Sequence, residues 1–208
     1  MSVKNTKPRI PQQQRSIQTK RLIIDAAMKL FSQKGFYNTN SKEIAKEAEV
    51  ATGCFYAYFS DKKEVFMAAL QIYFEQFNEI TQTHIVKPPS EKPATKRFFQ
   101  ELIRSFIAAH SVFTDLHHEL TAMYYTDPDI QKLVTEYDRS SIDWILKYLI
   151  SVREHLRVSN PEAAAKVVYW SIHNVIDAIV FSEKENAEVL IAELSDMLER
   201  YLFEGTIN

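Results

Sequence analysis

Glycine is scarce in this chain of 208 residues, which contains only three. Strand-rich folds usually need more glycine for their turns, and Leu, Ala, Ile, Lys and Glu recur throughout, so the composition favours an all-helical fold. The single cysteine, Cys54, excludes an internal disulfide and fits a reducing cytoplasm. No run of about 18 apolar residues is present to span a membrane, and no apolar segment follows the basic N-terminus as a signal peptide requires.

The charges of the two parts of the chain have opposite signs, although the net charge is only -2. Residues 1–63 contain 12 basic residues (Lys and Arg) and 5 acidic residues (Asp and Glu). The remainder contains 13 basic and 22 acidic residues. The first acidic residue is Asp25, and six basic residues precede it. A basic N-terminal part on an acidic body indicates that one end of the protein meets a polyanion.

The N-terminal part has the pattern of a short arm followed by small helices. Residues 1–16 are polar and read as a flexible basic arm. A first helix is expected from about Ser16 to Lys34, ended by Gly35. Asn40 and Glu43 form a capping-box pattern for a second helix that runs to about Ala48. A third short helix is expected over 52–59, and a long fourth helix over 61–83.

Five further helices are expected after the break at residues 87–90, near 93–110, 112–125, 128–156, 161–183 and 187–203. Asp127 and Asn160 each stand before a proline, which is the usual pattern for a helix start. We therefore predict an all-α protein of about nine helices. An N-terminal three-helix DNA-binding domain with a helix-turn-helix would occupy 17–63, and a larger ligand-binding and dimerisation domain would occupy 64–208.

The second and third helices have the length and spacing of a helix-turn-helix. The second helix of such a motif lies in the major groove, so its exposed first residues must be small or polar. Thr52, Gly53 and Cys54 meet that need, while Phe55 and Phe59 anchor the opposite face. The hydroxyl groups of Tyr56 and Tyr58 are suited to phosphate contacts. The ammonium groups of Lys62 and Lys63, at the start of the next helix, are suited to them as well.

The stretch from Ile44 to Glu64, with Ala26, Ala27, Phe31, Gly35, Phe36 and Thr39 upstream, resembles the DNA-binding signature of TetR/AcrR-type bacterial regulators. The resemblance implies DNA-binding roles for Thr39, Asn40, Thr52, Gly53, Cys54, Tyr56, Tyr58 and Lys62. Two positions depart from the family pattern. Glu49 replaces the usual turn glycine and must take up the turn itself. Ala51 replaces the usual capping serine, so Thr52 is the alternative cap.

The last two expected helices are apolar over most of their surface, which requires cover on two sides. A second copy of the chain would supply that cover through a four-helix bundle, and Val175 and Leu194 are expected in this interface. The family resemblance implies the same homodimer. A monomer with a buried central helix is the alternative. Aromatic and polar residues of the body are candidates for a small-molecule cavity: Phe106, His110, His117, Tyr124, Trp144, Tyr148, Trp170, His173, Asn174 and Asp177.

Catalytic and metal motifs are not apparent. His117, His118 and Glu119 do not form His-Glu-x-x-His, because the fifth position is Ala122. His173 and Asp177 lie one turn apart and are read as a side-chain pair. We expect no enzyme activity, no metal and no cofactor. The predicted function is that of a cytoplasmic, ligand-responsive transcription regulator. We expect it to act as a repressor that a small, largely apolar molecule releases from a palindromic operator in double-stranded DNA. A constitutive or protein-controlled DNA-binding regulator is the alternative.

Overall fold

The computed structural model describes residues 12–85, 96–112, 114–182 and 184–203. In these ranges the chain forms nine α-helices, two 3-10 helices and no strand beyond one isolated bridge between Leu156 and Phe203. The all-α prediction is confirmed. The helices are α1 (Gln12–Lys34), α2 (Ser41–Glu47), α3 (Thr52–Tyr58), α4 (Lys62–Ile85), α5 (Lys96–Val112), α6 (Thr114–Tyr124), α7 (Pro128–Ser151), η1 (Arg153–His155), α8 (Pro161–Phe181), η2 (Lys184–Asn186) and α9 (Ala187–Leu202).

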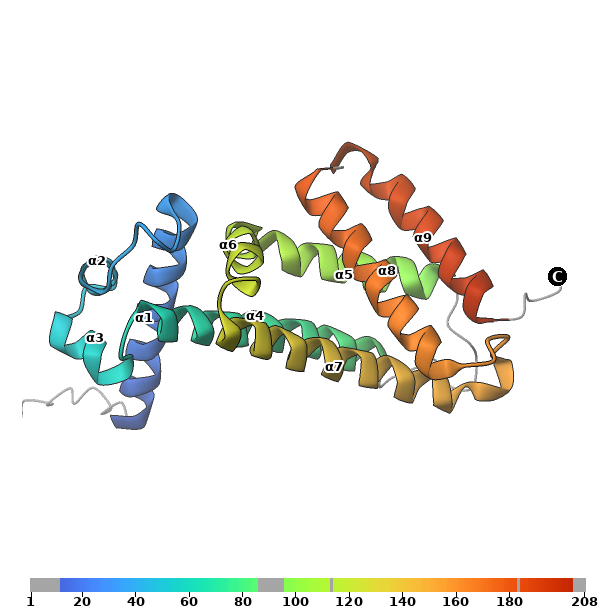
Figure 1. The fold of residues 1–208 in the computed structure, drawn as a ribbon, viewed down its shortest axis with the longest axis horizontal. Coiled ribbons are helices and arrows are strands. Elements are labelled where there is room, and N and C mark those ends of the chain that lie inside the picture. Colours follow the sequence, from blue (N-terminus) through green and yellow to red (C-terminus); the bar gives the residue numbers. More distant parts are fainter. Residues whose placement is uncertain (1–11, 86–95, 113, 183, 204–208) are drawn as a thin grey trace, which may run out of the picture. The chain divides into compact units, whose positions relative to one another are not determined.

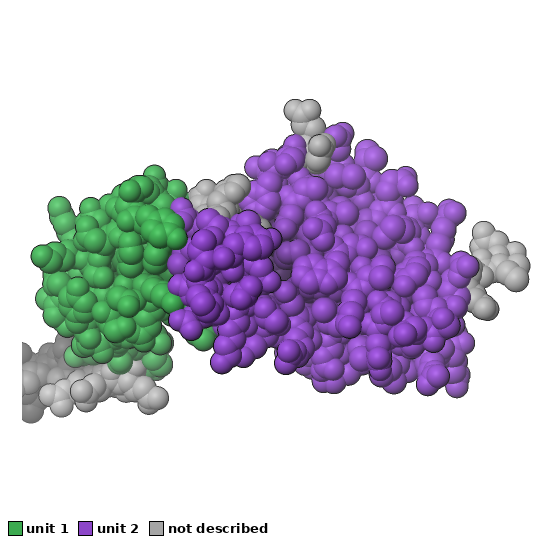
Figure 2. All heavy atoms as spheres, in the orientation of Figure 1, with its two compact units in different colours: residues 1–71 green, residues 72–208 purple. Residues whose placement is uncertain are grey.

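The chain divides into two compact units, Met1–Gln71 and Ile72–Asn208, which Figure 2 shows in different colours. The boundary falls within α4, so the first ten residues of this helix belong to unit 1 and the rest to unit 2. The functional domain limits expected at 16/17 and 63/64 remain predictions. Most of the arm expected at 1–16 lies outside the described residues.

Unit 1 is a small helical unit built around aromatic side chains. Phe31 of α1 and Phe66 of α4 are both buried, and their ring centroids lie 5.6 Å apart in an edge-to-face arrangement. Ile44 of α2 and Phe55 of α3 are fully buried as well. Because each short helix contributes a buried apolar side, the helix-turn-helix is held in place by this common core.

Two helix ends differ from the prediction by four residues or more. α1 begins at Gln12, four residues before the expected start at Ser16, because Gln and Arg are good helix formers and no glycine or proline interrupts residues 12–16. α7 ends at Ser151, whose hydroxyl donates a hydrogen bond of 2.7 Å to the carbonyl of Tyr148, and the chain continues as η1. The sequence has neither glycine nor proline at this point, so the end of α7 carried no visible signal.

Unit 2 is organised around α8, which packs against α5, α7 and α9. The helices α8 and α9 form an adjacent antiparallel pair joined through η2 (Figure 1). Both predicted helix starts are confirmed. Asp127 accepts from the backbone N–H groups of residues 129 and 130, and Asn160 accepts from that of Ala163. None of the described helices combines the length and apolar character that a membrane crossing requires.

The apolar surface of α8 and α9 is divided between the core of unit 2 and the solvent. Leu194 is only 5% exposed and belongs to the core of its own chain, so the expectation that it lies in an interface is wrong. Val175 is partly buried against the same core. Large apolar side chains that remain exposed on these two helices are Val167, Trp170, Val189, Met197 and Tyr201.

Candidate functional site

The start of α2 is fixed by a reciprocal cap. The Asn40 side chain accepts hydrogen bonds of 3.1 Å from the backbone N–H groups of Lys42 and Glu43, and the Glu43 carboxylate accepts one of 3.1 Å from the Asn40 N–H. Lys34 pairs with Glu43 at 2.7 Å. The hydrogen bond from Lys34 and the one from the Asn40 backbone lower the pKa of Glu43. The predicted capping box is therefore confirmed, and the ion pair between Lys34 and Glu43 connects it to the end of α1.

The turn between α2 and α3 has a strained residue. Glu49 has a φ of 54°, and among the described residues it is the single non-glycine with positive φ. The Val50 N–H donates to the Ala45 carbonyl at 2.9 Å, which closes the turn. As expected, Glu49 adopts the backbone conformation for which glycine is suited. Ala51 is the N-cap of α3 and makes no side-chain hydrogen bond, so the alternative of Thr52 as cap is wrong.

The first turn of α3 presents its small residues to solvent. Thr52 and Gly53 are exposed and Cys54 is partly exposed, while Phe55 and Phe59 are buried beneath them. A Cβ atom placed on Gly53 would meet nothing within 4 Å, so the fold does not require glycine there. The Tyr56 side chain is 53% exposed, and that of Tyr58 is half-buried.

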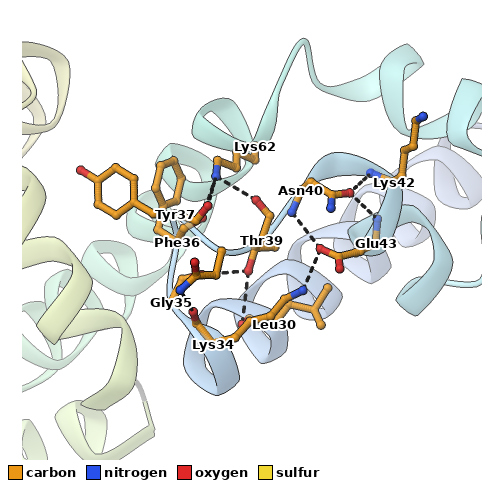
Figure 3. A network of polar contacts seen from close by, with 11 residues as sticks. Leu30, Lys34, Gly35, Phe36, Tyr37, Thr39, Asn40, Lys42, Glu43 and Lys62 are labelled. Atoms are coloured by element: carbon orange, nitrogen blue, oxygen red, sulfur yellow. Dashed lines mark hydrogen bonds and ion pairs between the residues drawn. The ribbon is translucent and has the colours of Figure 1, made fainter.

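Two residues expected at phosphate have structural partners inside unit 1 (Figure 3). The Thr39 side chain is buried, and its hydroxyl donates to the Gly35 carbonyl at 2.9 Å. The Lys62 ammonium donates to the carbonyls of Phe36, Tyr37 and Thr39 at 2.7, 3.2 and 2.8 Å, and it lies 4.5 Å from the centroid of the Phe36 ring. Both side chains therefore hold the segment between α1 and α2 that leads to Asn40.

Unit 2 contains a cavity of about 380 Å³ with largely aromatic walls. Eight of the ten predicted cavity residues line it: Phe106, His110, Tyr124, Tyr148, Trp170, His173, Asn174 and Asp177. Trp144 is placed elsewhere, with the Lys147 ammonium 5.1 Å from the centroid of its ring. His117 lies in α6, but its side chain is outside the described residues.

The same cavity has residues that sequence reasoning did not select. Tyr73 and Phe77 of α4 line it, as do Tyr137 and Asp138 of α7 and Tyr169 of α8. The aromatic residues of α4 follow helical spacing, but spacing alone does not distinguish a filled core from the wall of a cavity. The sequence of α4 therefore gave no reason to place Tyr73 and Phe77 at a cavity.

Polar groups gather at one part of the cavity wall. The Tyr73 hydroxyl lies 3.0 Å from Nδ1 of His110, and the Tyr169 hydroxyl donates to Asp138 at 2.6 Å. Burial raises the pKa of Asp138, against the opposing effect of the Tyr169 hydrogen bond. Burial and the hydrogen bond to Asp138 raise the pKa of Tyr169, so this phenol stays protonated as a donor. Among the described lining residues there is no Lys or Arg.

Two family models match the chain. The model of the N-terminal domain of bacterial regulatory proteins of the tetR family matches residues 23–69, and that of the tetracyclin repressor-like C-terminal domain matches residues 96–202. The chain belongs to the TetR family of bacterial regulators. It is thus a DNA-binding transcriptional regulator, and the predicted resemblance is confirmed. The N-terminal match includes α2, α3 and the turn between them.

Individual relatives are more distant. The chain is 28% identical over 133 residues to the uncharacterized HTH-type transcriptional regulator YuxN of Bacillus subtilis, and the match covers 64% of this chain but only 45% of YuxN. A putative TetR-family regulator of Mesorhizobium loti has a similar fold, with a TM-score of 0.74 and 21% identity, covering 91% of this chain and 99% of that one. A putative regulator of Saccharomonospora viridis, solved with choline, has a TM-score of 0.73 and 15% identity, covering 91% and 100%.

Proposed function

We propose that this TetR-family regulator is a repressor that leaves its operator when a small molecule occupies the cavity of unit 2. The cavity is the observation that carries this proposal. Its volume of about 380 Å³ falls within the range of small-molecule sites. Support also comes from the structural neighbour of Saccharomonospora viridis, which was solved as a complex with choline.

The lining indicates the kind of molecule. Aromatic walls favour a largely apolar effector, and the carboxylates of Asp138 and Asp177 favour hydrogen-bond donors or a positive charge at its polar end. The faces of Tyr and Trp rings also attract cations. An effector with a strong negative charge is disfavoured, because the described part of the lining offers it no basic side chain other than the histidines.

On the DNA side, α3 would enter the major groove with its first turn foremost. Thr52, Gly53 and Cys54 would then face base edges, and the hydroxyls of Tyr56 and Tyr58 would reach phosphates. The phosphate contact proposed for Asn40 would be made from the exposed start of α2. Thr39 and Lys62 would act on DNA binding mainly by holding the segment before α2, since their polar groups bond within unit 1.

We further propose a homodimer through α8 and α9. Five large apolar side chains are exposed on these helices, and a second copy would cover them by two-fold symmetry. A two-fold dimer would place two α3 helices in successive major grooves of a palindromic site. The apolar residues would supply the centre of the interface and the surrounding charged residues its rim.

The link between cavity and DNA would run through α4. Tyr73 and Phe77 of this helix line the cavity, while its first residues pack in the core of unit 1. A ligand that binds one position of α4 better than another shifts the population of that position. A coupling of about 1–3 kcal/mol would change operator affinity by roughly 5–150-fold.

The experiment begins with selection of bound DNA from a random pool, followed by affinity measurements with and without a panel of small aromatic compounds and amines. We expect some of them to bind the protein and weaken operator binding. Phe106→Ala should reduce that response, while Ile150→Ala, at an exposed position of α7 away from the cavity lining, should keep it. If compounds that bind the cavity leave operator affinity unchanged, the constitutive or protein-controlled alternative holds.

A further inference from the structure

Two histidines and an aspartate meet in the wall of the cavity although they are distant in sequence. His110 lies near the end of α5, and His173 and Asp177 lie one turn apart on α8. One possible ligand atom from each of the three residues lies within 4.8 Å of the other two. We propose that His110, His173 and Asp177 bind a divalent transition-metal ion of the zinc type.

The spacing of the three groups is close to that of a metal site. Bonds of about 2.0–2.2 Å to nitrogen and carboxylate oxygen place the ligand atoms of a tetrahedral zinc roughly 3.4 Å apart. Nε2 of His173 and Oδ2 of Asp177 are 3.5 Å apart and already have this separation. One ligand atom of each residue lies within 4.8 Å of those of the other two, so an ion would draw these atoms together by at most about 1.4 Å through rotation of the half-buried His173 and Asp177 side chains.

The surroundings of His110 are those of a metal-binding imidazole. This side chain is 4% exposed, and its ring packs edge-to-face on Phe77 with a centroid distance of 4.7 Å. Its Nδ1 lies 3.0 Å from the Tyr73 hydroxyl. Metal-binding histidines commonly use their second ring nitrogen in this way, because the hydrogen bond fixes the tautomer and the ring orientation. We therefore assign Nε2 of His110 to the ion and a supporting role to Tyr73.

The chemistry of the donors identifies the class of ion. Imidazole nitrogens suit zinc, copper, iron and nickel, whereas magnesium and calcium prefer sites made of oxygen alone. All three residues line the cavity. Three protein ligands leave a coordination position for water or for an oxygen or sulfur atom of a bound molecule. The ion would then contribute to effector recognition, and this last point alone rests on the proposed function.

Metal binding can be tested on the full-length protein without operator or effector, so failure of the proposed function would not affect the result. The protein is treated with a chelator, dialysed, and titrated with zinc by calorimetry and with cobalt by visible absorption. We expect one ion per chain at this site and the strong absorption bands of low-coordinate cobalt. His110→Gln and His173→Gln should abolish the bands. Tyr73→Phe should weaken affinity by about 10–100-fold, as loss of a supporting hydrogen bond usually does.

The matched control is His155→Gln, because His155 is exposed on η1 and lies outside the cluster. This variant should bind cobalt like the parent protein. Circular dichroism in the presence of chelator checks that every variant folds. If the His110 variant is unstable, the His173 variant still tests the site, because the His173 side chain is partly exposed and its substitution should disturb the fold less. An unchanged spectrum in His173→Gln, or no binding by the parent protein, would overturn the proposal and leave a hydrogen-bonded polar cluster.

Discussion

Gly53 offers a test at the scale of one residue, because its surroundings leave room for a side chain. Nothing lies within 4 Å of a Cβ atom placed there, and the residue sits in the first turn of α3. Gly53→Ala should stabilise the fold by about 0.5–1 kcal/mol, since glycine in a helix costs that much relative to alanine. The same methyl group should weaken operator binding by blocking close approach to DNA. Urea unfolding and an operator titration measure the two effects, and a variant with unchanged operator affinity would remove Gly53 from the interface.

Lys62 is predicted to act through stability rather than through a phosphate contact. Its ammonium donates to three carbonyls of the segment before α2. Lys62→Met removes these charge-assisted hydrogen bonds and should destabilise the protein by about 1.5–3 kcal/mol. The salt dependence of operator affinity should remain close to that of the parent, whereas loss of a phosphate contact would lower the slope by about one unit. A full unit of change at unaltered stability would restore the phosphate assignment.

In unit 1, hydrogen bonds between residues close in sequence were easier to predict than those between distant residues. Asn40 and Glu43 were predictable as a cap, because both groups act within four residues of the chain. The partners of Lys62 lie 23 to 26 residues away, and only the packing of α4 beside the segment before α2 brings them together. From the sequence alone, Lys62 was therefore interpreted as a lysine at a helix start that contacts phosphate.

At the scale of elements, the turn between α2 and α3 combines strain with an unfavourable charge for DNA binding. Glu49 has a φ of 54°, which glycine adopts without steric cost. Glu49→Gly should raise the free energy of unfolding by about 1 kcal/mol. It should also strengthen DNA binding, because a negative charge near phosphate is removed. Glu49→Gln is the control that removes the charge and keeps the strain, so it should strengthen DNA binding without a similar gain in stability. A loss of stability in Glu49→Gly would contradict this account.

Helix positions were predictable wherever a capping residue or a proline marks them, as at Asp127 and Asn160. They were less predictable at the start of α1 and the end of α7, where good helix formers continue past the expected limit or no breaker is present. The cavity could not be predicted from helix signals of this kind. The aromatic stripes of α4, α5 and α8 follow the same helical spacing whether they fill a core or surround a space, and only their packing distinguishes the two cases.

At the scale of the whole molecule, the two exposed apolar faces of α8 and α9 predict the assembly. Met197 is 45% exposed on α9, so Met197→Glu should leave the folded protomer intact. In a dimer through this face the new charge would be buried without a partner at a cost of several kcal/mol, and dissociation should follow. Ile150→Glu, at a position 57% exposed on α7, is the control and should remain dimeric. Sedimentation measures both, and an intact dimer in Met197→Glu would place the interface elsewhere. Leu194 is unsuited to this test, because a charge there would disrupt the core of the protomer.

Occupation of the cavity and binding of operator DNA are proposed to be coupled. Coupling of this kind is reciprocal, so DNA must weaken ligand binding by the same factor by which ligand weakens DNA binding. The most direct measurement is a calorimetric titration of a compound shown to bind the cavity, carried out with the free protein and with the operator complex. Coupling of about 1–3 kcal/mol predicts that the compound binds roughly 5–150-fold more weakly to the operator complex. Equal affinities in the two titrations would contradict it.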